Sequence, residues 1–238
     1  MALYEIAGLA VDMEPVHPTL SSRAAPYRLP APGRRADIAI RQPEGYIDRM
    51  QQANPSLGAD QCEYLRFGSC FYRSLLRFDG MMLHASAVAL DGRAYLFTAH
   101  SGTGKSTHTA QWLKLFGERA AILNDDKPAL RWIGGQLCAC GTPFSGKTPL
   151  SQNRCVPVGG ICLLERGSQN RIWRISPREA VAFLFDQTIH SLYQQDMERL
   201  LGVLQSVLET AQLYRMQCTI GTDAARTAHQ AMAGGHKC

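Results

Sequence analysis

The sequence predicts an α/β fold with a mixed β-sheet at its core, a small β-rich region before the core and helices after it. Three observations favour this fold. A glycine-rich turn at residues 101–104 separates a strand-like segment from a helical one, which is the order of elements in an α/β unit. Apolar segments of strand length recur between residues 82 and 165. Leucines at helical spacing follow after residue 196.

We expect two regions, residues 1–78 and residues 79–238. In the first, residues 3–11 and 37–40 are strand-like, and the prolines at positions 26, 30 and 32 would interrupt any helix between them. A polar segment follows, and residues 71–78 are apolar enough for a short helix. The sequence therefore predicts a small β-rich layer here, without indicating its role.

The core is expected to begin with a β-hairpin over residues 82–98. Asp91-Gly92 separates two apolar strands and is a two-residue hairpin signal. The glycine-rich turn comes next, and the helix after it should run over residues 105–116, since Gly117 is typical of a helix end. Further strands share a short apolar composition, at residues 121–124, 130–140 (a second hairpin) and 158–165.

The last third of the chain is predicted to be helical. Ser176 and Glu179 form a capping box with Pro177 at the first helical position, which predicts a helix start. A second helix is expected over residues 196–211, where Leu200, Leu204 and Leu208 should face the core. A short strand near residue 214 and a helix from residue 223 end the chain.

The composition is that of an ordinary globular protein. Hydrophobic residues make up 45% of the chain and charged residues 19%, with a net charge of +5 that is not gathered into a run. This mild basicity suits a protein that handles anions, but it does not indicate a nucleic-acid partner. Apolar segments such as residues 180–185 are far shorter than the roughly 20 residues that span a membrane, so we expect no membrane partner.

The cysteines favour a reducing compartment. Eight are present, with no C-x-x-C pair, and the closest two are Cys138 and Cys140. No histidine pair lies beside them at zinc spacing, and the first residues lack the basic and apolar segments of a secretory signal. We therefore predict reduced thiols in a cytoplasmic protein.

The glycine-rich turn fits the phosphate-loop pattern, except that Ala99 replaces its first glycine. Glycines allow consecutive backbone N–H groups to approach phosphate oxygens, and the following helix adds the positive end of its dipole. ATP is the expected ligand. Lys105 should contact its β- and γ-phosphates, and Ser106 should bind Mg²⁺. The predicted binding residues are Ser101, Gly102, Thr103, Gly104, Lys105, Ser106 and Thr107.

Two adjacent acids follow about twenty residues later, Asp125 and Asp126, at the end of a predicted strand. A parallel sheet would place that strand beside the glycine-rich turn, so both carboxylates should face the magnesium ion and the γ-phosphate. One would hold the metal and the other would accept a proton from an attacking hydroxyl. The sequence leaves open which aspartate has which role.

An ordered set of segments resembles the catalytic domain of HPr kinase/phosphorylase, a family related in structure to ATP-dependent phosphoenolpyruvate carboxykinase. The set comprises residues 84–88, 91–97, 101–107 and 124–128. Residues 141–147 and 163–167 are similar to short HPr-kinase-like proteins, some of which are peptide kinases of lasso-peptide gene clusters. The resemblance does not extend to the N-terminal region, nor to HPr as the acceptor.

The resemblance also implies roles for individual residues. His84 matches a histidine of the family's active site, and Asp125 and Asp126 match its paired aspartates. Lys147 and Arg166, together with Arg154, are candidates for neutralising the charge on the transferred phosphoryl group. HPr kinases assemble into hexamers, so the resemblance implies a homo-oligomer. The residues themselves leave the oligomeric state open.

The function expected from these residues is transfer of the γ-phosphoryl group of ATP to a hydroxyl. The acceptor would be a serine or threonine of a peptide or protein, or a small molecule. Two alternatives stay open: a nucleotide-binding regulator or scaffold without transfer activity, and a carboxykinase acting on a keto acid. The chain is much shorter than carboxykinases, and the two aspartates favour an enzyme over a regulator.

Overall fold

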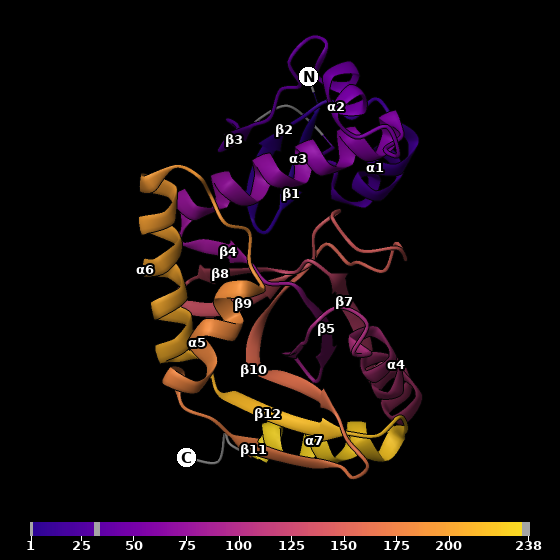
Figure 1. The fold of residues 1–238 in the computed structure, drawn as a ribbon, viewed down its shortest axis with the longest axis vertical. Helices are drawn as coiled ribbons and strands as arrows, with labels where there is room; N and C mark the ends of the chain where they lie inside the picture. The colour runs from indigo at the N-terminus through magenta and orange to yellow at the C-terminus, as the bar shows by residue number, and fades with distance from the viewer. Residues whose placement is uncertain (1, 31–33, 235–238) are drawn as a thin grey trace.

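The computed structural model describes residues 2–30 and 34–234, which form a mixed α/β fold with two β-sheets (Figure 1). The smaller sheet has the order β1-β2-β3 and lies in the N-terminal region. The larger sheet has nine strands and carries the helices of the second half of the chain. The predicted mixed sheet, N-terminal sheet and C-terminal helices are therefore all present.

The N-terminal region contains more helix than expected. Its strands are β1 (Leu3–Ile6), β2 (Leu9–Asp12) and β3 (Ile38–Ala39). Its helices are α1 (Pro18–Ala24), α2 (Tyr46–Ala53) and α3 (Ala59–Leu75), with short 3-10 turns η1 (Ala25–Tyr27) and η2 (Leu76–Phe78).

Two local features explain the difference from the prediction. The single strand expected over residues 3–11 is a hairpin, because Ala7 and Gly8 adopt the positive φ angles of a two-residue turn, 53° and 74°. Helix α1 forms within the proline-rich segment because Pro18 occupies its first turn, where a proline is tolerated.

The larger sheet has the order β4-β8-β9-β10-β6-β5-β7, with β12 paired to β10 and β11 paired to β12. Its strands are β4 (Gly80–Met82), β5 (Ala85–Leu90), β6 (Arg93–Thr98), β7 (Ala120–Asp126), β8 (Ala129–Ile133), β9 (Gln136–Cys140), β10 (Cys155–Arg166), β11 (Arg171–Arg174) and β12 (Leu213–Cys218). Most of these strands lie where the sequence predicts them, whereas β11 was not anticipated.

Strand direction brings four carboxyl ends to one edge of this sheet. Strands β6, β10 and β12 run parallel to one another. Strand β5 is antiparallel to both β6 and β7, so β7 runs in the same direction as β6. We expected β7 to lie directly beside β6, but β5 separates them. Ala85 of β5 pairs with both Thr98 and Asp126, which places those two residues roughly 10 Å apart.

Helices cover both faces of the sheet. Helix α4 (Lys105–Phe116), followed by η3 (Gly117–Arg119), packs with α7 (Thr222–Gly234) around Trp112. Helices α5 (Pro177–Asp186) and α6 (Gln194–Thr210) cover the other face (Figure 1). The three leucines of α6 predicted to face the core are buried there, as expected from their spacing.

The N-terminal region shares a hydrophobic core with the larger sheet. Phe71 of α3 and Phe144, in the segment after β9, are fully buried in one cluster with Cys140 of β9. Their rings lie 5.7 Å apart. The described part of the N-terminal region is therefore packed onto β8, β9 and the segment after β9.

One prediction about the cysteines is wrong. Cys140 and Cys155 lie opposite each other in the antiparallel pair β9–β10 and form a disulfide. No local pattern indicates this pairing, because it depends on the segment 141–154 returning to the neighbouring strand. Among the described residues, no helix combines the length and the apolar character that a membrane crossing requires.

Candidate active site

The glycine-rich turn connects β6 to α4 and has the geometry of an open cradle. Gly102 and Gly104 have φ angles of 78° and 116°, which residues with a Cβ rarely adopt. The first hydrogen bond of α4 joins the amide of His108 to the carbonyl of Gly104, at 2.9 Å. The amides of Lys105, Ser106 and Thr107 therefore precede the helix ladder and are available to an anion.

Two basic side chains contact the turn. The Lys105 ammonium donates to the carbonyl of Ala99 at 3.0 Å. Burial lowers the pKa of Lys105, and the carboxylates of Asp126 and Asp125 partly oppose this change. The Arg166 guanidinium, at the carboxyl end of β10, donates to the carbonyls of Gly102 and Thr103, at 2.5 and 3.3 Å. Positive charge thus lies at both sides of the cradle.

Asp125 is buried at the end of β7, with 8% of its surface exposed. One carboxylate oxygen, Oδ2, accepts a hydrogen bond from the Thr148 hydroxyl at 3.1 Å. The other oxygen, Oδ1, is buried and has no hydrogen-bond partner in the described part of the chain. A buried carboxylate oxygen without a donor is costly, so a position beside it suits a cation or a proton.

Asp126 lies in a denser network of charged groups. Its carboxylate contacts His84 Nε2 at 2.9 Å and Lys127 Nζ at 3.0 Å. Burial would raise the pKa of Asp126, but the hydrogen bonds and charges of His84 and Lys127 outweigh it and lower this pKa to about 2. Asp126 also has a φ of 128°, an unusual value for a residue with a side chain. It is therefore ionised and held in a strained backbone.

His84 is fixed from its other side by Gln187, which follows α5. The ring Nδ1 lies 3.2 Å from the Gln187 side-chain oxygen, and the His84 amide donates to the Gln187 carbonyl at 2.7 Å. Gln187 is itself buried. A chain of contacts thus runs from Gln187 through His84 to Asp126, and it orients the imidazole toward the carboxylate.

The segment 141–154 covers the aspartates. The amide of Gly146 donates to the Asp125 carbonyl at 2.8 Å. A Cβ at position 146 would come within 3.0 Å of the Asp126 Cβ, so the close approach favours glycine. This segment is held in turn by the N-terminal region. Arg23 of α1 donates to the carbonyls of Ser145 and Gly146, at 2.8 and 2.9 Å, and Tyr64 of α3 donates to the Ser145 carbonyl.

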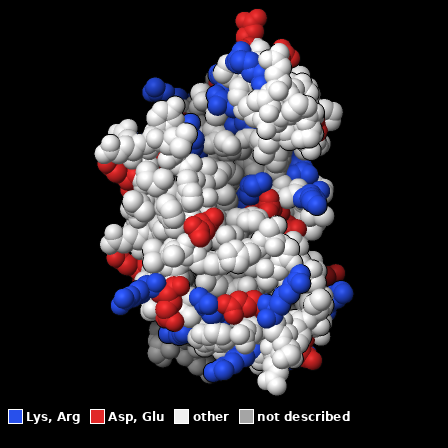
Figure 2. Space-filling model, in the orientation of Figure 1, with Lys and Arg blue, Asp and Glu red and all other residues white. Residues whose placement is uncertain are grey.

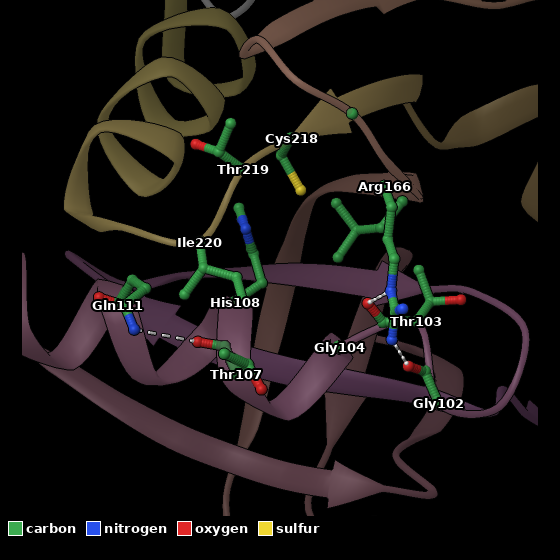
Figure 3. Close-up of a pocket in the computed structure, with 12 residues that line it drawn as sticks. Gly102, Thr103, Gly104, Thr107, His108, Gln111, Arg166, Cys218, Thr219 and Ile220 are labelled. Atoms are coloured by element: carbon green, nitrogen blue, oxygen red, sulfur yellow. Dashed lines mark hydrogen bonds between the residues drawn. The ribbon is translucent and has the colours of Figure 1, made fainter.

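A pocket of about 560 Å³ is lined in part by the glycine-rich turn (Figure 3). Its walls come from the turn and the first helix residues after it, and from the carboxyl ends of β10 and β12. The residues labelled there include Thr107 and Gln111 of α4, Arg166 at the end of β10, and Cys218, Thr219 and Ile220. The aspartates do not line this pocket. Such a position, outside the carboxyl ends of parallel strands, is where α/β sheets bind ligands.

The structure brings most of the predicted site residues to one edge of the sheet. His84, Asp126 and Asp125 form one group, and residues 101–107 with Arg166 form the neighbouring one. Lys147 is different. It is exposed on the covering segment and has no hydrogen bond or ion pair within the described residues. Arg154 is also exposed, and within the described chain its side chain forms one hydrogen bond, to the Gln152 side chain at 3.5 Å.

The two histidines near the turn mainly pack against other side chains. His100 is exposed and lies against the ring of Phe183. His108 is buried beside Phe97 and accepts a hydrogen bond from Trp112, and burial lowers its pKa to about 4. It stays neutral at physiological pH.

Sequence reasoning assigned no role to four residues that complete the site: Lys127, Thr148, Gln187 and Arg23. Lys127 follows the aspartates directly, so its position offered a local signal. The other three are far from the aspartates in sequence and reach them only through tertiary packing.

No family model matches the chain, and a search of curated proteins found no similar sequence. Among solved structures, the chain is similar to the Hpr(Ser) kinase/phosphatase from Coxiella burnetii, with a TM-score of 0.37 and 11% sequence identity, covering 65% of this chain and 95% of that chain. The function therefore has to be inferred from the residues of the site.

Proposed function

We propose that the protein is an ATP- and Mg²⁺-dependent phosphotransferase that moves the γ-phosphoryl group to a hydroxyl. One observation carries the proposal. The half-buried Lys105 is the first residue of α4, where the amides of residues 105–107 precede the helix ladder, and the carboxylates of both aspartates act on its ammonium. Phosphoryl transfer needs this combination of phosphate-binding amides, a bridging cation and acidic groups.

ATP fits the glycine-rich turn together with the pocket beside it. The amides of residues 105–107 and the dipole of α4 would hold the phosphates. The neighbouring pocket of about 560 Å³ is within the size range of small-molecule sites, and it would take the nucleoside. Lys105 would exchange its contact with the Ala99 carbonyl for the phosphates.

The side chains around Asp125 suit a magnesium ion. The unpartnered Oδ1 of Asp125 and the exposed Ser106 side chain are oxygen donors of the type that Mg²⁺ prefers. Within the described residues there is no cluster of three or more His, Cys, Asp or Glu side chains arranged for a metal. Magnesium bound with a nucleotide needs only one or two carboxylates besides phosphate and water. When bound, it would neutralise charge on the phosphates.

Asp126 is then the acceptor of the hydroxyl proton. Its side chain is 25% exposed, which leaves it reachable, and its pKa of about 2 keeps it ionised. A weak base can serve here, because the transition state of phosphoryl transfer is loose and catalysis depends mainly on positioning and charge. His84 and Lys127 would hold the carboxylate in place. Arg166, at the turn, would offset negative charge on the phosphates.

The acceptor side faces the segment 141–154, where Lys147 is exposed and unpaired within the described chain. A peptide serine or threonine, or a smaller alcohol, would approach Asp126 from there. A serine or threonine of a peptide is the leading acceptor. A homo-oligomer, which the family resemblance implies, and a cytoplasmic location, which the cysteines favour, stay predictions.

A combined binding and transfer assay tests the proposal. Full-length protein would be titrated with a fluorescent ATP analogue, with and without Mg²⁺, and then given γ-labelled ATP with serine and threonine peptides, simple alcohols or oxaloacetate. We expect Mg²⁺-dependent binding and label on a hydroxyl. Lys105→Met should weaken binding about 10- to 100-fold, as loss of a charge-assisted contact does. Lys114→Met, an exposed change on the same helix, should not.

Each other outcome selects an alternative. Tight binding without transfer to any acceptor would support a nucleotide-binding regulator. ADP formation that requires oxaloacetate would support a carboxykinase. Absence of ATP binding would remove all three functions, because each depends on the cradle.

A further inference from the structure

A second polar pocket, of about 460 Å³, lies far from the glycine-rich turn in sequence and is lined by five arginines. They come from three places: the end of β3, one face of α3 with η2, and α6. The arginines are Arg41, Arg66, Arg73, Arg77 and Arg199. Figure 2 shows several basic side chains over the N-terminal region in the upper part of the molecule, with acidic groups at its very top.

Three of these arginines form a stripe along one side of α3 and the η2 turn that follows it. Arg66, Arg73 and Arg77 are separated by seven and four residues, with Cys70 and Ser74 between them on the same lining. This spacing keeps them on one face of a helix. The opposite face, including Phe67 and Phe71, is buried in the core. Like charges four residues apart destabilise a helix, so the stripe is unfavourable without an anion beside it.

The protein neutralises only part of this charge. Arg73 and Arg199 share a single carboxylate, Asp196, at 3.2 and 3.5 Å. Arg41 pairs with Asp12, and the charge of Glu14 also acts on it. Five guanidinium groups therefore meet three carboxylates.

The remaining two arginines have the fewest hydrogen-bond and ion-pair partners among the described residues. Arg66 lies 5.2 Å over the ring of Tyr46, and its buried Nε has no hydrogen-bond partner in the described residues. Arg77 is exposed and forms no hydrogen bond or ion pair with the described chain. Donors in this state are typical of sites that bind carboxylates or phosphates.

We propose that this arginine pocket binds a short acidic peptide segment in an extended conformation. The stripe from Arg66 to Arg77 covers eleven residues, or roughly 16 Å along the helix axis. A single phosphate cannot contact both ends, whereas about five extended residues can. The pocket lining also includes Ala39 of β3, an edge strand paired on one side only in the described sheet. Edge strands are common docking sites for extended peptides.

This binding site goes beyond the proposed phosphotransferase function and does not depend on it. None of its lining residues belongs to the glycine-rich turn or to the aspartate group. Peptide binding can therefore be measured without ATP, and either inference can fail alone.

Fluorescence anisotropy with a labelled hexapeptide of alternating Asp and Glu tests the site on the full chain. Wild type should bind it in 50 mM salt and lose affinity steeply as salt rises, because several charge pairs form. The double variant Arg66→Gln/Arg77→Gln should bind at least about tenfold more weakly, as loss of two charged hydrogen bonds implies. Arg178→Gln/Arg226→Gln changes the net charge equally at exposed positions elsewhere and should bind like wild type.

Controls separate the outcomes. Circular dichroism should show both variants folded. If the double variant unfolds, the single change Arg77→Glu, at an exposed position, replaces it with the same expected loss. No peptide binding, or equal binding by all variants, would overturn the proposal. Displacement of the peptide by inorganic phosphate at equal concentration would also overturn it and indicate a compact anion site.

Discussion

The two halves of the candidate active site are built differently. The glycine-rich turn and the first turn of α4 are continuous in sequence, and several of their residues are exposed. The aspartate half is assembled from β7, the start of β5, the segment 141–154 and Gln187, and its key groups are mostly buried. The first half owes its shape to local backbone preferences, whereas the second depends on tertiary packing.

This difference suggests that the glycine-rich turn serves nucleotide binding and the aspartate group serves transfer. A local, open cradle can bind and release a nucleotide without disturbing the core. A packed group of carboxylates and cations keeps its geometry while the ligand changes, which is the requirement for preorganised catalysis. Changes in the aspartate half should therefore alter transfer or stability more than nucleotide affinity.

The largest expected effect is on transfer. Asp126→Asn should lower the rate of phosphoryl transfer about 1,000-fold, within the range for loss of a general base. ATP affinity should stay within about twofold, since the cradle is untouched. Single-turnover kinetics and nucleotide titration measure the two quantities. Full activity of both Asp126→Asn and Asp125→Asn would show that the two halves do not work together.

The next effect is on stability, through the disulfide that closes the segment 141–154. The disulfide between Cys140 and Cys155 closes a loop of fifteen residues over the aspartates, and a loop of this length contributes about 3 kcal/mol. Cys140→Ser/Cys155→Ser should lower the free energy of unfolding by about that amount in urea titrations. Dithiothreitol should destabilise wild type and leave the double variant unchanged. Equal responses of the two proteins would rule out the disulfide.

Protonation of Asp126 at low pH should have a smaller effect, on the free energy of unfolding. Its pKa is about 2 in the folded protein against an ordinary value of 3.8, so the folded state favours the ionised form. The stabilisation is present above pH 4 and is lost as the pH falls toward 2, and it amounts to about 2 kcal/mol. Urea titrations should show this loss in wild type and in Asp223→Asn, an exposed control. The loss should be absent from Asp126→Asn, and parallel curves would contradict the assigned contacts.

The smallest effect tests the N-terminal contact. Arg23→Gln removes the hydrogen bonds to two carbonyls of the segment 141–154, each with a net contribution of about 1 kcal/mol. The transfer rate should fall roughly 5- to 30-fold, which corresponds to one or two such bonds, with ATP affinity unchanged. Ser21→Ala on the same helix serves as the control. A matching loss of nucleotide affinity would mean that Arg23 supports the fold generally.

Sequence reasoning was most successful where structure is local. The hairpin at Asp91-Gly92, the helix over residues 105–116 and the capping box at Ser176 all lie where their turn and cap residues indicate. It was less successful where packing decides. The α3 helix begins at Ala59, twelve residues earlier than expected, because its buried face becomes evident only against the N-terminal sheet.

The aspartate half shows the same limit. The pair Asp125 and Asp126 could be predicted from its distance to the turn, and His84 from the family resemblance. The intervening strand β5 could not, since strand order is a tertiary property. Arg23, Thr148 and Gln187 carry no local motif, and only their contacts reveal them.

Strand β10 has a consequence for how this protein tolerates change. Its first residue, Cys155, is bonded to Cys140, and its last, Arg166, reaches the carbonyls of the glycine-rich turn. Because consecutive strand residues point to opposite faces, inserting or deleting a single residue between them would turn one end the wrong way. The number of residues in β10 is therefore constrained, and related sequences should carry insertions and deletions in the surrounding loops rather than in this strand.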